Sequence, residues 1–485
     1  MTALHELGAA EIARRVRARE LRAEDVTQAC LQRIRALDPR LGAFLLVLDQ
    51  AALARAREID VTTARGGDPG PLAGVPVALK DVLDCEGIPT TCGSRLLQGY
   101  RPPFSATAVR RLEQSGAVIL GKTNMDEFAM GSSTENSAFQ KTRNPWDLER
   151  VPGGSSGGSA VAVAAGLAPL AFGTDTGGSV RQPAALCGVV GVKPTYGRVS
   201  RYGLVAFGSS LDQIGPLARN VEDAALALSV VSGHDPADAT SSSRPVPDFL
   251  GALRAPDARR RVGVPWSFLE QGVDPGSLRL FREALRALEG LGATIIDVSL
   301  PALPHAIAAY YLVATAEASS NLARFDGVRY GMRAGETRDL QALYGRTRDQ
   351  GFGPEVKRRI LLGTFALASG YYDAYYLRAQ KTRQLIREDY ERAFLACDVI
   401  ATPTSPSTAF RLGEKTDDPL QMYLADIFTV PANLAGLPAV SVPCGLSSGL
   451  PVGLQLVAPP FEEAPMLALA HAYEATAGPR PRPPL

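Results

Sequence analysis

Hydrophobic residues follow two different spacings along the chain, and each spacing predicts a different kind of element. From about Ala9 to Arg65 the apolar positions, Ile12 and Val16 among them, keep helical spacing between faces rich in Arg and Glu. This pattern predicts an α-helical opening layer over residues 1–65.

Beyond this layer, short apolar runs bounded by glycine alternate with stretches of helix length. We expect each run to be a buried strand. The runs are Val75–Leu79, Ala117–Leu120, Val262–Val264, Ala293–Val298, Val399–Thr402 and Ala439–Val442, and an amphipathic segment lies at Ser277–Leu291. Strands that alternate with helices predict an α/β fold whose sheet is covered by helices on both faces.

The length of 485 residues alone suggests about three domains, although a single large α/β domain is often longer than the average domain. A break rich in Asp, Ser, Pro and Arg at Asp235–Arg261 is interpreted as a surface crossover within one domain, residues 1–485. The stretch Ala306–Tyr376 predicts a helical insertion that covers a site. Residues Gly478–Leu485 hold four prolines, which predicts a frayed tail.

Composition narrows the function classes. Lys plus Arg (51) nearly balances Asp plus Glu (50), so no global field draws the chain to nucleic acid or anionic lipid. The six cysteines form no C-x-x-C pair and only four histidines exist, so we expect reduced, mostly buried thiols and no metal site. Neither a secretion signal nor an apolar run of membrane-spanning length is present, which favours a cytoplasmic enzyme without membrane contact.

Two motifs match known chemistry but stand in the wrong context. Gly116–Thr123 fits the phosphate-loop pattern G-x-x-x-x-G-K-[ST], but its four middle residues favour a buried strand over a loop that wraps phosphate. Gly153–Gly157 fits the nucleophile elbow G-x-S-x-G, which needs a buried strand before the serine and a later histidine base. The preceding stretch, Asn144–Val151, is polar, and no histidine stands in a catalytic context.

Two Gly-Ser segments, Gly153–Ser159 and Gly173–Pro183, carry the strongest candidate chemistry. The first alone is compatible with a flexible linker, but an apolar helix of small residues, Ala160–Ala165, follows at once. About one helix and one strand separate the segments, which allows both to reach the same end of the sheet. Lys80 ends the strand Val75–Leu79; a lone lysine there is usually solvated, but in a dry pocket it acts as a base without histidine.

With Lys80, Ser155 and Ser179, the motifs G-G-S-S-G-G-S and G-T-D-T-G-G-S-V-R-Q-P resemble the Ser-cisSer-Lys triad of the amidase-signature family. The resemblance extends from about Gly74 to Pro216. It implies a single large α/β/α sandwich with a mixed central sheet, whose catalytic core spans residues 66–235. It further implies that Ser179 is the nucleophile, Ser155 the bridging serine and Lys80 the base.

The same resemblance implies a cis peptide bond between Gly154 and Ser155. It also implies an oxyanion hole formed by the loop Thr176, Gly177, Gly178 and Ser179. In such a site the nucleophile attacks an amide carbonyl, the bridging serine relays the proton to lysine, and ammonia leaves an acyl-enzyme that water opens.

A narrower resemblance connects the chain with the A subunits of tRNA-dependent amidotransferases. It is carried by Ser133–Ala138, Glu317–Gly327, Gly363–Leu367, Gly370–Tyr376 and Ala425–Thr429. This resemblance implies that Arg359 holds the carboxylate of a glutamine substrate and Asp426 its amino group, with Tyr310 nearby, a chemically sensible pairing. Arg358 is adjacent, so the arginine assignment stays open by one position, and surface ion pairs are the alternative for these residues.

The subfamily resemblance also implies partners. We expect a heterotrimer with B and C subunits, in which the B subunit uses ATP and Mg²⁺ and makes most contacts with the aminoacyl-tRNA, while this chain holds no cofactor. The ammonia would serve transamidation of misacylated Glu-tRNA(Gln), Asp-tRNA(Asn) or both, a choice that the sequence leaves open.

Two other functions remain as alternatives. A stand-alone amidase on small or acyl amides would keep the triad but have an apolar acyl pocket in place of Arg359 and Asp426. A catalytically silent assembly protein would keep the Gly-Ser loops as structure only.

Overall fold

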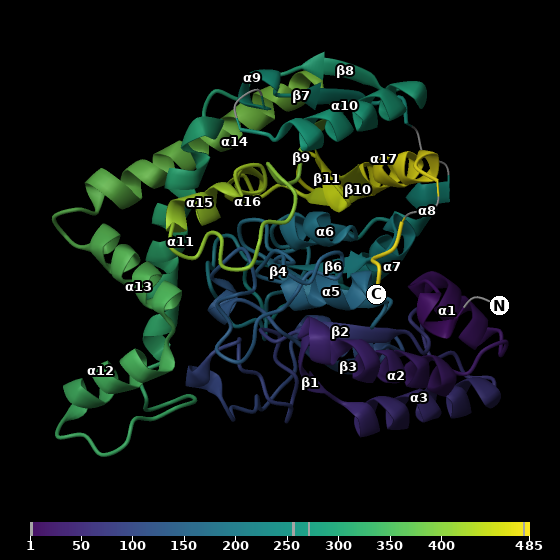
Figure 1. The fold of residues 1–485 in the computed structure, drawn as a ribbon, viewed down its shortest axis with the longest axis horizontal. Helices are drawn as coiled ribbons and strands as arrows, with labels where there is room; N and C mark the ends of the chain where they lie inside the picture. The colour runs from purple at the N-terminus through teal and green to yellow at the C-terminus, as the bar shows by residue number, and fades with distance from the viewer. Residues whose placement is uncertain (1–2, 255–257, 270–271, 479–480) are drawn as a thin grey trace.

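This computed structural model describes residues 3–254, 258–269, 272–478 and 481–485, and within them eleven strands form one mixed sheet (Figure 1). The spatial order is β1-β3-β2-β4-β6-β5-β10-β11-β9-β7-β8. The strands are β1 (Phe44–Val47), β2 (Pro76–Lys80), β3 (Val118–Thr123), β4 (Leu170–Asp175), β5 (Val190–Lys193), β6 (Gln213–Ala218), β7 (Arg261–Val264), β8 (Thr294–Asp297), β9 (Val399–Pro403), β10 (Ala439–Ser447) and β11 (Leu450–Val457).

The helices pack on the sheet or extend beyond it. They are α1 (Ala9–Arg17), α2 (Ala23–Leu41), α3 (Asp49–Ala64), α4 (Thr107–Gln114), α5 (Gly157–Ala164), α6 (Arg181–Cys187), α7 (Val221–Val231), α8 (Phe249–Arg254), α9 (Trp266–Leu269), α10 (Pro275–Gly290), α11 (Ala306–Asn321), α12 (Leu340–Gly351), α13 (Pro354–Leu367), α14 (Arg378–Ala396), α15 (Pro419–Leu424), α16 (Val430–Leu434) and α17 (Glu463–Thr476). Helices α5 and α6 contact each other and form one layer, whereas α7, α10 and α17 form another. The predicted α/β fold with a helix-covered mixed sheet is confirmed.

Most predicted elements form where the apolar pattern placed them. All six expected runs are strands, and the amphipathic segment becomes α10. The last six residues of the phosphate-loop motif, Val118–Thr123, form β3, as expected from their buried character. One prediction is wrong: the opening layer is not purely helical, because β1 interrupts it and pairs antiparallel with β3. Four apolar residues are too few to show a period, and pairing with β3 satisfies their backbone groups.

The segments beyond the sheet agree in part with expectation. The crossover Asp235–Arg261 contains α8, while its residues 255–257 lie outside the described part of the chain. The predicted insertion Ala306–Tyr376 contains α11, α12 and α13, which reach away from the strands on the left of Figure 1. Of the predicted tail, residues 479–480 are not described and Pro481–Leu485 form no helix or strand. The assignment of the chain to one domain with these boundaries stays a prediction.

The sheet register brings the candidate residues together. Strand β2 is the parallel neighbour of β4, with Val77 opposite Leu170 and Leu79 opposite Phe172. Because the carboxyl ends of parallel neighbours meet at one edge of a sheet, Lys80 at the end of β2 lies beside Thr174 at the end of β4. Among the described residues, no helix is long and apolar enough to cross a membrane.

Candidate active site

Lys80 lies in a buried, polar pocket at the end of β2. Its side chain is completely buried. The Nζ atom donates to Ser155 Oγ at 2.7 Å and to Thr174 Oγ1 at 2.9 Å. The alternative of a solvated surface lysine is therefore excluded, and the ammonium or amine of Lys80 is in direct contact with a serine hydroxyl.

Burial also changes the protonation of this lysine. It lowers the pKa of Lys80 to about 7, although the nearby carboxylates of Asp126, Asp175 and Asp212 act to raise it. Near neutral pH a large fraction of Lys80 is therefore the neutral amine. Only that form can take a proton from a serine.

The segment around Ser155 is a tightly packed loop and not a linker. The peptide bond between Gly154 and Ser155 is cis. A Cβ atom on Gly154 would lie 2.1 Å from Asp126 Oδ2, so no side chain fits there. The amide of Gly154 donates to Gln182 Oε1 at 3.0 Å, and α5 begins directly afterwards at Gly157. Because both sides of the loop are fixed, Ser155 presents its hydroxyl to Lys80 from a rigid backbone.

Ser179 lies between β4 and α6, next to the first Gly-Ser segment. The amide of Ser156 donates to the carbonyl of Ser179 at 3.1 Å, so the two serine-bearing segments meet as their spacing predicted. Ser179 is 8% exposed. Within the described residues, no hydrogen bond joins the hydroxyls of Ser155 and Ser179.

The backbone amides of residues 176–179 differ in whether they already donate a hydrogen bond. Gly178 N already donates to Asp175 Oδ1 at 2.9 Å. In the described part of the chain, the amides of Thr176, Gly177 and Ser179 have no acceptor. In this conformation three of the four predicted oxyanion amides therefore have no acceptor, and that of Gly178 already has one.

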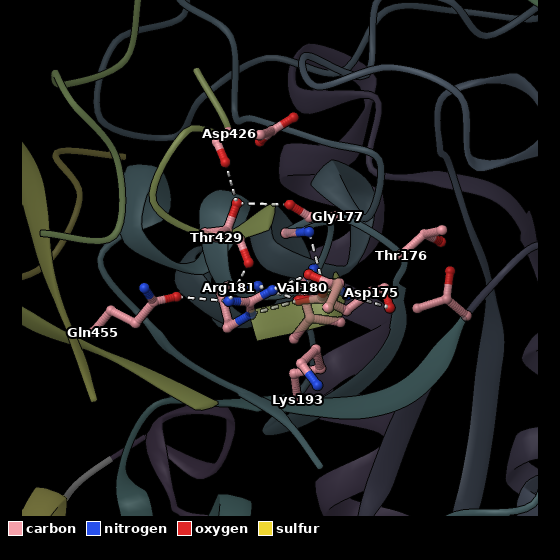
Figure 2. Close-up of polar contacts among 12 residues, drawn as sticks. Asp175, Thr176, Gly177, Val180, Arg181, Lys193, Asp426, Thr429 and Gln455 are labelled. Atoms are coloured by element: carbon pink, nitrogen blue, oxygen red, sulfur yellow. Dashed lines mark hydrogen bonds and ion pairs between the residues drawn. The ribbon is translucent and has the colours of Figure 1, made fainter. Parts of the chain in front are cut away.

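A buried ion pair between Asp175 and Arg181 holds the loop of residues 176–179 in place. Arg181 Nη2 lies 2.9 Å from Asp175 Oδ1, and both side chains are completely buried. Burial acts to raise the pKa of Asp175, but Arg181 outweighs it and holds that pKa at about 2. Figure 2 shows Arg181 between Asp175 and two residues from distant parts of the chain: its Nη1 donates to the carbonyl of Thr429 at 3.0 Å and to Gln455 Oε1 at 2.6 Å.

Arg359 is held inside an aromatic and acidic pocket. It is 2% exposed, and its Nε donates to Glu355 Oε1 at 2.7 Å. Its guanidinium lies 5.1 Å from the ring of Tyr311 and 5.5 Å from that of Tyr423. The neighbouring Arg358 has a 44% exposed side chain. Burial therefore favours Arg359 over Arg358 as the cation of this site.

Tyr310 and Asp426 border the same region. A Cβ atom on Gly177 would lie 2.6 Å from the Tyr310 hydroxyl, so this tyrosine packs directly on the loop of residues 176–179, the predicted oxyanion hole. Asp426 accepts a hydrogen bond from Ser132, whereas its buried Oδ1 has no partner in the described residues. Burial raises the pKa of Asp426 to about 7. A buried carboxylate oxygen without a donor is suited to receive an ammonium group.

In the described ranges, no three His, Cys, Asp or Glu residues gather in a way that could hold a metal ion. All six cysteines are free thiols, and five of them are buried.

Sequence reasoning missed several residues that complete the site. Thr174 and Asp175 stand inside the G-T-D-T-G-G-S motif, so their chemistry was visible although no role was assigned to them. Asn433 and Gln455 contact Arg181 from 252 and 274 positions away and carry no local signal. Only the fold brings these amides to the loop.

Comparison with known proteins places these features in a family. The sequence model of the family described as Amidase matches residues 25–467. The chain is 60% identical to the A subunit of glutamyl-tRNA(Gln) amidotransferase from Anaeromyxobacter dehalogenans (strain 2CP-C), over 99% of this chain and 98% of that protein. It is 57% identical to the protein of the same name from Carboxydothermus hydrogenoformans, over 97% of both chains.

Solved structures agree with this likeness. The crystal structure of the A subunit of glutamyl-tRNA(Gln) amidotransferase from Thermotoga maritima matches with a TM-score of 0.84 and 46% identity, over 100% of this chain and 98% of that chain. The native peptide amidase of Stenotrophomonas maltophilia matches with a TM-score of 0.82 and 34% identity, over 99% and 98%.

Proposed function

The chain belongs to the amidase family, and from this premise we propose that it hydrolyses the side-chain amide of glutamine as the A subunit of a tRNA-dependent amidotransferase. The observation that carries the proposal is the buried contact of 2.7 Å between Lys80 Nζ and Ser155 Oγ, beside the segment that bears Ser179. A buried lysine whose pKa is lowered to about 7 supplies the base that the chain's histidines do not.

The proposed reaction begins when the Ser179 hydroxyl turns toward Ser155. Ser179 Oγ forms a bond to the amide carbon while its proton passes to Ser155, and the Ser155 proton passes to neutral Lys80. The negative charge on the former carbonyl oxygen is stabilised by free loop amides. The carbon–nitrogen bond then breaks, the proton returns to the nitrogen, and ammonia leaves. Water opens the glutamyl ester by the same relay and releases glutamate.

Glutamine recognition is proposed to use the two buried charges. The Arg359 guanidinium pairs with the substrate carboxylate and the free Oδ1 of Asp426 with its ammonium group, while Tyr310 packs against the loop that faces the amide. These buried groups support glutamine over the alternative, an amidase for small or acyl amides with an apolar pocket. Steady-state hydrolysis of glutamine and of aliphatic amides such as propionamide separates the two; a preference for propionamide would favour the stand-alone amidase.

The proposed destination of the ammonia is a partner. Relatives named as A subunits support an amidotransferase built from several chains. We propose B and C subunits as the partners, with ATP, Mg²⁺ and aminoacyl-tRNA handled mainly by the B subunit. The near balance of 51 basic and 50 acidic residues supports a chain that need not grip RNA. The cytoplasmic location stays a prediction.

Coupling between the chains of this assembly is testable. A free glutaminase would lose ammonia to protonation in water, and a sequestered path avoids that loss. We expect that adding the B and C subunits, ATP and Glu-tRNA or Asp-tRNA accelerates glutamine hydrolysis at least about tenfold, or about 1.4 kcal/mol. Kinetics with each component omitted in turn measures this, and equal rates for the free chain and the assembly would favour a stand-alone enzyme.

A catalytically silent assembly protein is the remaining alternative. A fluorophosphonate that reacts with an activated serine tests it directly. Labelling that maps to Ser179 supports the proposal, whereas an unlabelled protein would favour the silent role.

A further inference from the structure

Thr429 lies between Asp426, the proposed site of the substrate's ammonium group, and the loop of residues 176–179, the proposed oxyanion hole. It is completely buried. Its Oγ1 is 2.7 Å from the carbonyl oxygen of Gly177 and 3.1 Å from the carbonyl oxygen of Asp426 (Figure 2). A hydroxyl has one proton to donate. The Asp426 carbonyl already accepts from the amides of Thr429 and Val430, so the proton of Thr429 belongs to the shorter contact with Gly177.

This contact fixes one peptide plane of the oxyanion loop. The carbonyl of Gly177 and the amide of Gly178 belong to the same planar unit. Thr429 holds the carbonyl end, and Asp175 Oδ1 accepts from the amide end at 2.9 Å. The fit is close, because a Cβ atom on Gly178 would lie 2.2 Å from Thr429 Oγ1. With both ends of this plane held, the amides of Gly177 and Ser179 on either side of it have defined directions.

The turn that carries Thr429 begins at Asp426. The amides of Thr429 and Val430 both donate to the Asp426 carbonyl, at 3.1 and 3.0 Å, so hydrogen bonds connect the two ends of this turn. The free Oδ1 of Asp426 stands at one end of the turn and the contact with Gly177 at the other. A ligand that orders the Asp426 carboxylate therefore also orders the support of the oxyanion loop.

We propose that Thr429 is a positioning residue that couples recognition of the substrate's α-amino group at Asp426 to the geometry of the oxyanion loop. The proposal rests on the function proposed above, because it uses Asp426 as the ammonium site. Its consequence is that the amino group of glutamine accelerates the chemical step as well as binding, through a hydroxyl that touches neither the substrate nor the reacting atoms.

The test uses two variants and two substrates, with the full chain assembled with its partners. Thr429→Val keeps the side-chain shape and removes the donor, whereas Thr429→Ser keeps the donor. Glutaramate is glutamine without its α-amino group. For the wild type we expect kcat to be at least about tenfold higher with glutamine than with glutaramate. In Thr429→Val, kcat for glutamine should fall about tenfold while KM changes less than about threefold, so the ratio of the two kcat values approaches one. Thr429→Ser should restore most of that ratio.

Several outcomes would overturn the coupling. They are an equal fall in kcat for both substrates in Thr429→Val, a Thr429→Ser variant that behaves like Thr429→Val, or equal kcat values for the two substrates in the wild type. The last comparison needs no variant, so the proposal stays testable if Thr429→Val does not fold. Wild-type protein that hydrolyses glutamine but shows no coupling refutes only this inference, whereas wild-type protein that does not hydrolyse glutamine refutes the proposed function.

Discussion

Replacing Asp426 with asparagine removes one buried charge and leaves the side chain almost unchanged in shape. The asparagine oxygen can still accept the hydrogen bond from Ser132. Its amide nitrogen then occupies the place of Oδ1, which has no partner within the described residues and is assigned to the substrate ammonium. A donor would thus face a donor, and recognition of the amino group should be lost while the fold is kept.

The expected magnitude follows from the kind of bond that is lost. A hydrogen bond to a charged group contributes about 1.5–3 kcal/mol. At about 1.4 kcal/mol for each factor of ten, this predicts that kcat/KM for glutamine falls about 10- to 150-fold in Asp426→Asn. For glutaramate, which has no ammonium group, kcat/KM should change by less than about threefold.

The pH dependence provides a second readout. Burial raises the pKa of Asp426 to about 7, so the free carboxyl group is mostly neutral below pH 7 and charged above it. The wild-type KM for glutamine should therefore fall as the pH rises through about 7, and in Asp426→Asn this change should vanish. Steady-state kinetics from pH 5.5 to about 9 measures both effects.

A folding control and a clear refutation complete this test. Because the variant lacks a buried charge, it should melt at no lower temperature than the wild type at pH 8. Equal losses of kcat/KM for glutamine and glutaramate in a folded variant would show that Asp426 supports the structure and does not bind the substrate's amino group. An unchanged kcat/KM for glutamine would remove it from the site.

Three further predictions concern the base, the relay and the arginine. Burial lowers the pKa of Lys80 to about 7, so kcat should rise with pH through that value; a flat profile, with chemistry shown to limit the rate, would count against lysine as the base. Lys80→Ala and Ser155→Ala should each lower kcat by several orders of magnitude, and the double variant should add little, whereas additive losses would mean that the two act independently. Arg359→Lys should raise KM for glutamine at least about tenfold, since lysine lacks the planar fork. The matched control Arg358→Lys, at an exposed ion pair, should change KM less than about twofold, and the reverse order would reassign the carboxylate site.

The fold was predictable where a buried element consists of consecutive apolar residues. Runs such as Val75–Leu79 are apolar throughout because β2 is buried on both faces. Strand β1 was missed because its four residues lie in the short connection between α2 and α3 and show no period of their own. Its place in the sheet depends on the partner strand β3, which local pattern does not contain.

Those residues of the site that belong to contiguous sequence motifs were predictable. Lys80 ends β2, Ser155 lies in the loop before α5, and Ser179 lies in the loop between β4 and α6. The parallel pairing of β2 with β4 brings Lys80 close to the second of these loops. The support of the loop was not predictable in this way, because Thr429 and Gln455 reach it only through tertiary packing. The hydrogen bonds that Thr429 Oγ1 and the Gly178 amide donate could be assigned only from atomic positions.

The most direct test of the account is to trap the acyl-enzyme. Protein assembled with its partners is mixed with glutamine, quenched in acid on the millisecond scale, digested, and analysed by mass spectrometry for a glutamyl ester. The account predicts an ester on the peptide that carries Ser179 in the wild type and none in Ser179→Ala, which should stay folded and still bind glutamine. A glutamyl ester on another residue, or glutamine turnover above a few per cent of wild type in Ser179→Ala, would contradict it.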